Sequence, residues 1–227
     1  MSNKRLGTIT IGQAPRTDIT PILAAHIAND VECIHLGVLD NFDKQTINNR
    51  FKPQHGEAIL TTRLLDNTSV ILGKTEVQKC LQHKIDELQQ KNCSIIALLC
   101  TGEFHGLTCR KSLLIEPDRV IPPTISAIIG NRKLGIIVPL KEQINSEAAK
   151  WQGLKQPPCF SVSSPYIGTE KTLTEATEEL LKQHVDLIIL DCMGFTYIHQ
   201  TIVKQLSGNV PVVLSNALLA RLLAELM

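Results

Sequence analysis

Aromatic side chains and an excess of basic charge are both scarce in this 227-residue chain. Aromatics make up 4% of it, and 23 lysines and arginines face 22 aspartates and glutamates, so the net charge is +1. Nucleic-acid-binding surfaces need a basic face, and single-strand binders add aromatic rings on which bases stack. The sequence has neither feature, and we expect no nucleic acid among its partners.

Long apolar runs and targeting signals are missing as well. No stretch approaches the roughly 18 apolar residues of a membrane span. The opening MSNKRLGTITIG lacks the apolar core and the small-residue cleavage site of a signal peptide. The phosphate-binding patterns GxGxxG and Walker A do not occur. We therefore expect a soluble, cytoplasmic protein with no membrane partner.

Cysteine is present, but its number and spacing argue against two common uses. The seven residues are Cys33, Cys80, Cys93, Cys100, Cys109, Cys159 and Cys192. The number is odd and no CxxC pair occurs, which argues against a disulfide framework and against a zinc ribbon. In a reducing compartment most of these thiols are expected to be small buried side chains, and we predict no metal site.

Apolar strand-like runs alternate with helical patterns along the chain. Strands are predicted at 5–12, 31–39, 93–100, 132–140, 159–164, 185–192 and 210–215, with a hairpin at 57–74 that turns at 66–68. Helices are predicted at 17–30, 75–92 with Thr75 as N-cap, 125–129 after two prolines, 141–151, 170–184, 196–206 and 216–227. This alternation, with continuously apolar strands, is typical of an α/β fold with mainly parallel sheets.

The two halves of the chain resemble each other, although buried parallel strands are similar in many proteins. LGTITIG at 6–12 matches LGIIVPL at 134–140, and SIIALLCTG at 94–102 matches DLIILDCMG at 186–194. We predict two pseudo-symmetric βαβ lobes facing a central cleft. Their expected bounds are 1–120 for the first lobe, with a hairpin insertion near 41–74, and 121–215 for the second, with a helix at 216–227 that packs back toward the first lobe.

Cys100 and Cys192 end the two matched strands, and each is followed two residues later by a glycine. Ligands of open α/β sheets bind beyond the carboxyl ends of the strands. If the lobes face each other, the two sulfurs point into one cleft from opposite sides. One thiolate could then remove an α-proton while the other thiol returns a proton to the opposite face, without metal or cofactor. The alternative is that both cysteines are ordinary core residues.

The turns after the two cysteines could stabilise the carbanion that such a reaction forms. Backbone N–H groups in these turns can bind a substrate carboxylate, and Gly102 and Gly194 allow the backbone to approach a ligand closely. A helix that begins after Cys192 would favour the thiolate form of that residue. Met193 lies in the same turn.

Segments throughout the chain resemble the AroM protein family: TIGQAPRTDITPIL, IEPDRVIPP, GIIVPLKEQ, KWQ, KQPPCFS, DLIILDCMGF and VPVVLSNALLARLLAEL. The paired CTG and DCMG segments are also similar to the cysteine motifs of the aspartate, glutamate and hydantoin racemase superfamily. The resemblance implies the two-lobed racemase fold with its cleft. The second racemase cysteine carries over onto Cys192, and the first onto Cys100.

The loop after the first strand supplies further candidates, since the resemblance places it near the substrate. Arg16 could pair with a carboxylate through its planar guanidinium, and Gln13, beside Gly12, could contribute a hydrogen bond. Alternatively, this segment is only a helix start, capped by Thr17 or Asp18.

Four more positions complete the candidate site, each with an ordinary structural alternative. Thr101 could bind a substrate carboxylate or cap the next segment. Pro139 closes the matched strand of the second half and could shape the cleft. Ser215 and Asn216 follow the last strand; the resemblance places them near the site, while either could instead be a helix cap.

The leading hypothesis is a cofactor-independent racemase or isomerase of a small carboxylate-bearing molecule, with Cys100 and Cys192 as its acid/base residues. Two alternatives stay open. One is a decarboxylase or cis-trans isomerase of the same superfamily that uses a single cysteine. The other is a non-catalytic metabolite-binding or regulatory protein, which the family resemblance links to aromatic amino-acid metabolism. Because proteins of this fold often associate, a homodimer is a further expectation.

Overall fold

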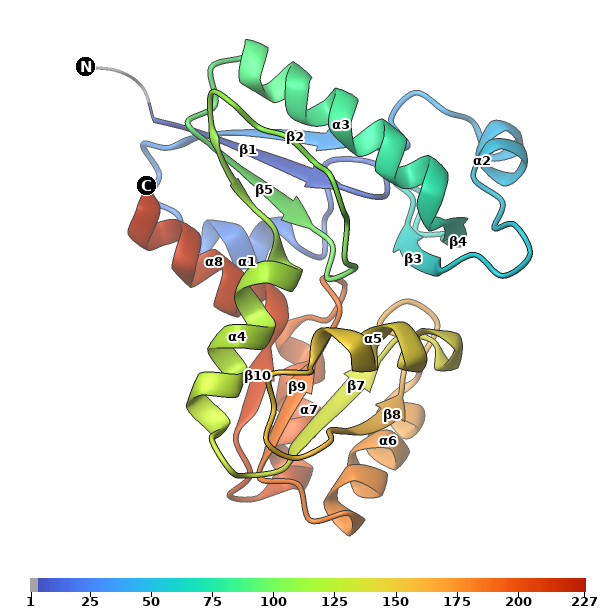
Figure 1. The fold of residues 1–227 in the computed structure, drawn as a ribbon, viewed down its shortest axis with the longest axis vertical. Coiled ribbons are helices and arrows are strands. Elements are labelled where there is room, and N and C mark those ends of the chain that lie inside the picture. Colours follow the sequence, from blue (N-terminus) through green and yellow to red (C-terminus); the bar gives the residue numbers. More distant parts are fainter. Residues whose placement is uncertain (1–3) are drawn as a thin grey trace. The chain divides into compact units, whose positions relative to one another are not determined.

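Two compact lobes make up the protein in the computed structural model, which describes residues 4–227 (Figure 1). The first lobe contains the chain up to Pro117 together with Ala220–Met227, and the second lobe contains Asp118–Leu219. Within residues 4–227, no helix has both the length and the apolar character needed to cross a membrane.

A four-stranded parallel sheet with the order β2-β1-β5-β6 forms the centre of the first lobe. Its strands are β1 (Arg5–Thr10), β2 (Glu32–Gly37), β5 (Ile95–Leu99) and β6 (Leu113–Ile115). An antiparallel hairpin joins β3 (Ile59–Arg63) and β4 (Ser69–Gly73). The helices are α1 (Thr20–Ala24), α2 (Lys44–Arg50) and α3 (Lys74–Gln90). Helix α3 lies along one face of the sheet, and α1 lies on the other (Figure 1).

The second lobe has its own four-stranded parallel sheet, with the order β10-β9-β7-β8. Its strands are β7 (Leu134–Val138), β8 (Cys159–Val162), β9 (Leu187–Leu190) and β10 (Val212–Leu214). Its helices are α4 (Pro117–Ile129), a 3-10 turn (Lys141–Gln143), α5 (Ile144–Lys150), α6 (Glu170–Lys182) and α7 (Tyr197–Ser207). The last helix, α8 (Ser215–Leu226), begins in this lobe and ends in the first.

The strand order is the same in both lobes. The order β2-β1-β5-β6 corresponds to β8-β7-β9-β10, so that β1 matches β7 and β5 matches β9. These are the strands whose sequences resemble each other. The hairpin β3–β4 stands between the second and third strands of the first lobe, and the fully described second lobe has no counterpart of it. The predicted α/β fold with two similar lobes is confirmed.

Strand register decides which loops share a sheet edge. Thr10 at the end of β1 pairs with Leu99 at the end of β5, so the loop after β1 and Cys100 leave the same edge of the first sheet. In the second sheet, Leu190 pairs with both Ile137 and Leu214. In each sheet the chain crosses to opposite sides of its first strand, which makes this edge a topological switch point where α/β proteins bind ligands.

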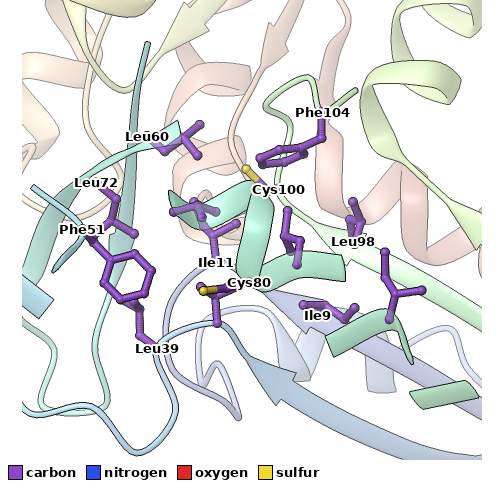
Figure 2. Packing of buried hydrophobic residues seen from close by; sticks show 14 of the residues in the cluster. Ile9, Ile11, Leu39, Phe51, Leu60, Leu72, Cys80, Leu98, Cys100 and Phe104 are labelled. Atoms are coloured by element: carbon purple, nitrogen blue, oxygen red, sulfur yellow. The ribbon is translucent and has the colours of Figure 1, made fainter. Parts of the chain in front are cut away.

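Buried side chains from α3 and the hairpin pack with the sheet to form the core of the first lobe (Figure 2). Leu81, Ile85 and Leu88 are spaced so that they fall on one face of α3, and all three are buried. Leu60 and Leu72 contribute from the hairpin. Truncation of such a side chain to alanine typically costs about 2–5 kcal/mol. The hairpin is therefore an integral part of this core.

The start of α3 differs from the prediction. Gly73 occupies the N-cap position, and Thr75 lies inside the first turn. The carboxylate of Glu57 accepts a hydrogen bond from the Thr75 backbone N–H at 2.6 Å. A side chain from the preceding loop thus satisfies this helix end, and a local sequence rule has no means of anticipating that.

Two other helices also begin elsewhere than predicted. Helix α1 has Ile19 as its N-cap without a side-chain cap, so neither Thr17 nor Asp18 caps it. Helix α4 includes Pro122 and Pro123, which were expected to precede it. Each proline lacks the N–H donor of a helix hydrogen bond, but its ring fixes φ near the helical value. The helix continues through both residues. The short strand β6 was not predicted.

Candidate functional site

Cys100 follows β5 directly and is 8% exposed. Its sulfur lies within the apolar cluster of the first lobe, whose members there include Leu60 and Phe104 (Figure 2). The backbone N–H of Gly102 points to the sulfur, at 3.4 Å. Thr101 stands between them and is half-buried. Cys100 is therefore a strand-end thiol that has apolar neighbours and accepts a hydrogen bond from the backbone.

Gly102, two residues after Cys100, leaves room for a side chain of the hairpin. A β-carbon at Gly102 would lie 2.9 Å from Leu60 Cδ2 and 3.3 Å from the Cys100 sulfur. The first separation is shorter than real contacts allow, so a larger residue would displace the hairpin side chain or the turn. Gly102 thus lets the N–H approach the sulfur while the hairpin covers the turn.

Three glutamines of α3 hold the irregular loop that follows Cys100. Gln82 accepts a hydrogen bond from Thr108 N–H and donates one to the Thr108 carbonyl, both at 2.9 Å. Gln78 donates to the His105 carbonyl at 2.8 Å, and Gln89 accepts from two successive N–H groups further along. These side chains replace the backbone partners that a strand or helix would provide, so the loop has a defined path.

Arg16 is buried, and its guanidinium is already paired. Nε and Nη2 donate to the two carboxylate oxygens of Asp18 at 2.8 and 2.6 Å, in a bidentate arrangement. Nη1 donates to the hydroxyl of Thr62, from the hairpin, at 3.0 Å. A substrate carboxylate would reach the bidentate pairing predicted for Arg16 only by replacing Asp18. The arrangement joins the loop after β1 to the hairpin.

Gln13 and Gly12 also connect this loop to the hairpin. The Gln13 side chain accepts a hydrogen bond from Leu65 N–H at 3.0 Å. At Gly12, a β-carbon would lie 2.5 Å from the Arg63 carbonyl oxygen and from Thr62 Oγ1. Only glycine lets the hairpin backbone come this close. The first-lobe candidates therefore divide into the Cys100 turn and a loop whose polar groups fasten the hairpin.

Cys192 lies in the second lobe, two residues beyond β9, and is 7% exposed. Its sulfur has polar neighbours from another loop and from its own turn. The hydroxyl of Tyr166, from the loop after β8, lies 3.6 Å away, and the backbone N–H of Gly194 lies 3.5 Å away. This thiol is therefore placed against a side-chain group that can donate or accept a proton in a hydrogen bond.

Asn216 fixes the turn that contains Cys192. Its buried amide donates to the carbonyls of Met193 and Phe195 at 2.8 and 2.7 Å. Ser215 is fully buried, and its hydroxyl donates to the Asp191 carboxylate at 3.3 Å. Cys192, Met193, Gly194, Ser215 and Asn216 therefore form one hydrogen-bonded assembly. Both residues after β10 hold the neighbouring turn, because Leu214 and Leu190 are paired in the sheet.

A buried charged cluster lies under the same turn. Lys150 forms ion pairs with Glu147 and with Asp191, the latter at 3.4 Å, and the lysine side chain is only 4% exposed. Burial raises the pKa of Glu147 to about 8; the ammonium of Lys150 opposes this and the charge of Asp191 adds to it. At neutral pH Glu147 is therefore mostly protonated and neutral, beside the buried side chains of Lys150 and Asp191.

Pro139 is buried at the end of β7, the strand next to β9.

Helix α7 begins at Tyr197, and the ring nitrogen of His199 accepts a hydrogen bond from Thr196 N–H at 2.9 Å. This helix therefore begins within one residue of its predicted start, five residues beyond Cys192, and its N-terminus already has a capping partner.

Four of the remaining cysteines have the character of structural residues. Burial raises the pKa of the thiols of Cys33, Cys80, Cys93 and Cys109. A raised pKa disfavours the thiolate, which is the reactive form. None of the seven cysteines forms a disulfide, and residues 4–227 contain no group of three or more histidine, cysteine or acidic side chains that could hold a metal ion.

Sequence reasoning missed four residues of the second-lobe site: Tyr166, Glu147, Lys150 and Asp191. Asp191 belongs to the DCMG motif as the residue before Cys192, but no role was predicted for it. The other three lie on different loops or helices, and no local pattern marks them. Their only signal is topological, because the loops after β7 and β8 leave the same sheet edge as the turn after β9.

Solved structures of racemases and a decarboxylase share this fold. An unliganded arylmalonate decarboxylase superposes with a TM-score of 0.60 at 15% identity, over 97% of this chain and 92% of that one. The Picrophilus torridus aspartate racemase gives a TM-score of 0.59 at 13% identity, over 98% and 94%. A Francisella tularensis subsp. tularensis SCHU S4 glutamate racemase in complex with D-glutamate gives 0.64 at 12%, over 100% and 81%.

At these identities the similarity establishes the fold alone. Among curated proteins, none matches the chain. The model of a family described as AroM protein matches residues 6–227, which covers every strand and helix except the first residue of β1. The chain belongs to the AroM protein family.

Proposed function

We propose that this protein is a cofactor-independent racemase or isomerase of a small carboxylate-bearing metabolite, with Cys100 and Cys192 as its two acid/base residues. One observation carries the proposal. Each cysteine follows the equivalent strand of a repeated sheet, and each sulfur faces the N–H of a glycine two residues later, at 3.4 and 3.5 Å. Strand-end loops at such switch points are the usual ligand sites of α/β proteins.

The chemistry needs two groups of opposite protonation state. A thiolate takes the α-proton, so that an S–H bond forms, the C–H bond breaks and the electron pair stays on carbon. The second residue, a thiol, then gives its proton to the opposite face of that carbon. Backbone N–H groups in the turns supply hydrogen bonds to the carboxylate, whose negative charge grows as the carbanion forms.

Deuterium exchange tests the proposal across several classes of compound at once. The protein is incubated in D₂O with single enantiomers of amino acids, hydantoins and aryl-substituted acids, and incorporation at Cα is followed by NMR together with optical rotation. We expect exchange with inversion for one of these classes. Cys100→Ser and Cys192→Ser should each slow inversion by roughly 10²–10⁴-fold. Tight binding of a candidate substrate without any exchange would overturn the proposal.

A one-cysteine reaction, such as decarboxylation followed by protonation, is the second candidate. One contact favours it: the Tyr166 hydroxyl lies 3.6 Å from the Cys192 sulfur. A hydroxyl that donates a hydrogen bond to a thiolate stabilises that charged form. This candidate predicts that Cys100→Ser keeps most of the activity and that Cys192→Ser loses it. A purely binding protein would keep its ligand affinity in both variants and show no turnover.

A further inference from the structure

Tyr166 is fixed in place by the tight turn that follows β8. The Ser164 hydroxyl accepts a hydrogen bond from Tyr166 N–H at 3.2 Å, and the Ser164 carbonyl accepts one from Gly168 N–H at 2.9 Å. This turn leaves the same sheet edge as Cys192, because β8 and β9 both pair with β7. The ring is thus carried to the thiol by backbone geometry, and its hydroxyl lies 3.6 Å from the sulfur.

Gly194 independently fits the same ring. A β-carbon at this position would lie 2.3 Å from Tyr166 Cε1 and 2.5 Å from both Cζ and Oη. Those separations are far below van der Waals contact, so any other residue would push the phenol away from Cys192. Gly194 has no positive φ angle that would call for glycine. The space for the Tyr166 ring is therefore the physical reason for the glycine in DCMG.

We propose that Tyr166 is a positioning residue that holds the Cys192 sulfur through a hydrogen bond and favours its thiolate form. The inference rests on the function proposed above. A phenol ordinarily ionises near pH 10 and a thiol near 8.5, so the phenol keeps its proton when the thiol has lost its own. The phenol O–H then donates to the thiolate. When the sulfur has taken a proton from substrate, the S–H can donate to the phenol oxygen instead.

The proton balance involves only the substrate carbon and the sulfur. The C–H bond breaks, the S–H bond forms, and the tyrosine retains its own proton throughout while its hydroxyl rotates. A hydrogen bond to a charged group is worth more than one to a neutral group. The Tyr166 hydroxyl therefore stabilises thiolate over thiol, which a ring that only fills space would not do.

The test compares Tyr166→Phe with the unchanged protein. Phenylalanine keeps the ring, its packing on Gly194 and the backbone turn, and removes only the hydroxyl. Thiolate ultraviolet absorbance is titrated in both proteins and in their Cys192→Ser partners, and the difference within each pair isolates Cys192 whether or not a reagent can reach it. Removal of the hydroxyl should raise the midpoint of this difference titration by about one pH unit, a tenfold loss of thiolate at a given lower pH.

Cys159 supplies the internal control, because it begins β8 at the end of the strand opposite Tyr166. The difference titration between each protein and its Cys159→Ser variant should have the same midpoint with and without the Tyr166 hydroxyl. Emission of Trp151, which is buried in the second lobe, verifies that Tyr166→Phe is folded. An unchanged Cys192 midpoint would overturn this inference. The titration needs no substrate. If the midpoint shifts but no compound exchanges deuterium, the proposed reaction is therefore wrong while the inference about Tyr166 holds.

Discussion

The charged cluster beneath the Cys192 turn should make the second lobe less stable as the pH rises toward 8. Burial raises the pKa of Glu147 from its ordinary 4.5 to about 8. Between these two values the folded lobe binds a proton at Glu147 that the unfolded chain has released. Unfolding free energy then falls with pH. The contribution of Glu147 is therefore complete below pH 4.5 and is lost as the pH passes through about 8.

The expected magnitude follows from the size of the shift. One proton of difference changes the unfolding free energy by about 1.4 kcal/mol per pH unit. From about pH 5.5 to about pH 7.5, the loss is on the order of 2 kcal/mol, because the titration levels off near the folded pKa. Glu147→Gln keeps the shape of the side chain and its neutral state, and it cannot ionise. The variant should lack this part of the slope.

Urea unfolding at a series of pH values measures the effect. Trp151 is the only tryptophan of the chain, is 2% exposed and follows α5 directly, so its emission reports on the lobe that contains the cluster. The quantity of interest is the unfolding free energy of the unchanged protein minus that of Glu147→Gln. It should decrease by the amount above as the pH rises.

Glu142→Gln is the matched control, since Glu142 is an exposed carboxylate on the neighbouring 3-10 turn. Its difference from the unchanged protein should stay flat over the same range. If Glu147→Gln and the unchanged protein showed parallel pH profiles, Glu147 would have to be ionised in the fold, and the reasoning about the cluster would be refuted.

Two further substitutions test the turn after β9. Gly194→Ala should lower the unfolding free energy by about 1–3 kcal/mol through overpacking. In a Tyr166→Ala background, where the ring is absent, the same substitution should cost little. If the two costs were additive in urea unfolding, the ring and Gly194 would not be in contact. Asn216→Asp should destabilise the second lobe more at neutral than at mildly acidic pH, because a buried carboxylate would face the Met193 and Phe195 carbonyls. Asn216→Leu loses the same hydrogen bonds but introduces no charge. Its loss of unfolding free energy relative to the unchanged protein, followed by Trp151 emission, should therefore not depend on pH.

The site illustrates how far local patterns reach. CTG and DCMG were recognisable because each follows an apolar run, and apolar runs of this length that alternate with helices form parallel strands. Their position at a sheet edge then followed from the general rule for α/β proteins. The contacts of Arg16 could not be predicted in this way: its guanidinium donates hydrogen bonds to Asp18 and to Thr62 of the hairpin.

By itself, the sequence determined the alternation of strands and helices, the repeat that makes two similar lobes, the hairpin in the first of them, and the place of both cysteines at strand ends. All of these depend on hydrophobic periodicity and turn residues, which act over a few neighbours in the chain. Tertiary structure alone decided that Tyr166 meets Cys192 and that Lys150 meets Asp191. Those pairs lie far apart in sequence, and only the order and register of β8, β7 and β9 bring their loops to one edge. The glycine of DCMG is thus explained by the tyrosine ring that packs against it from another loop.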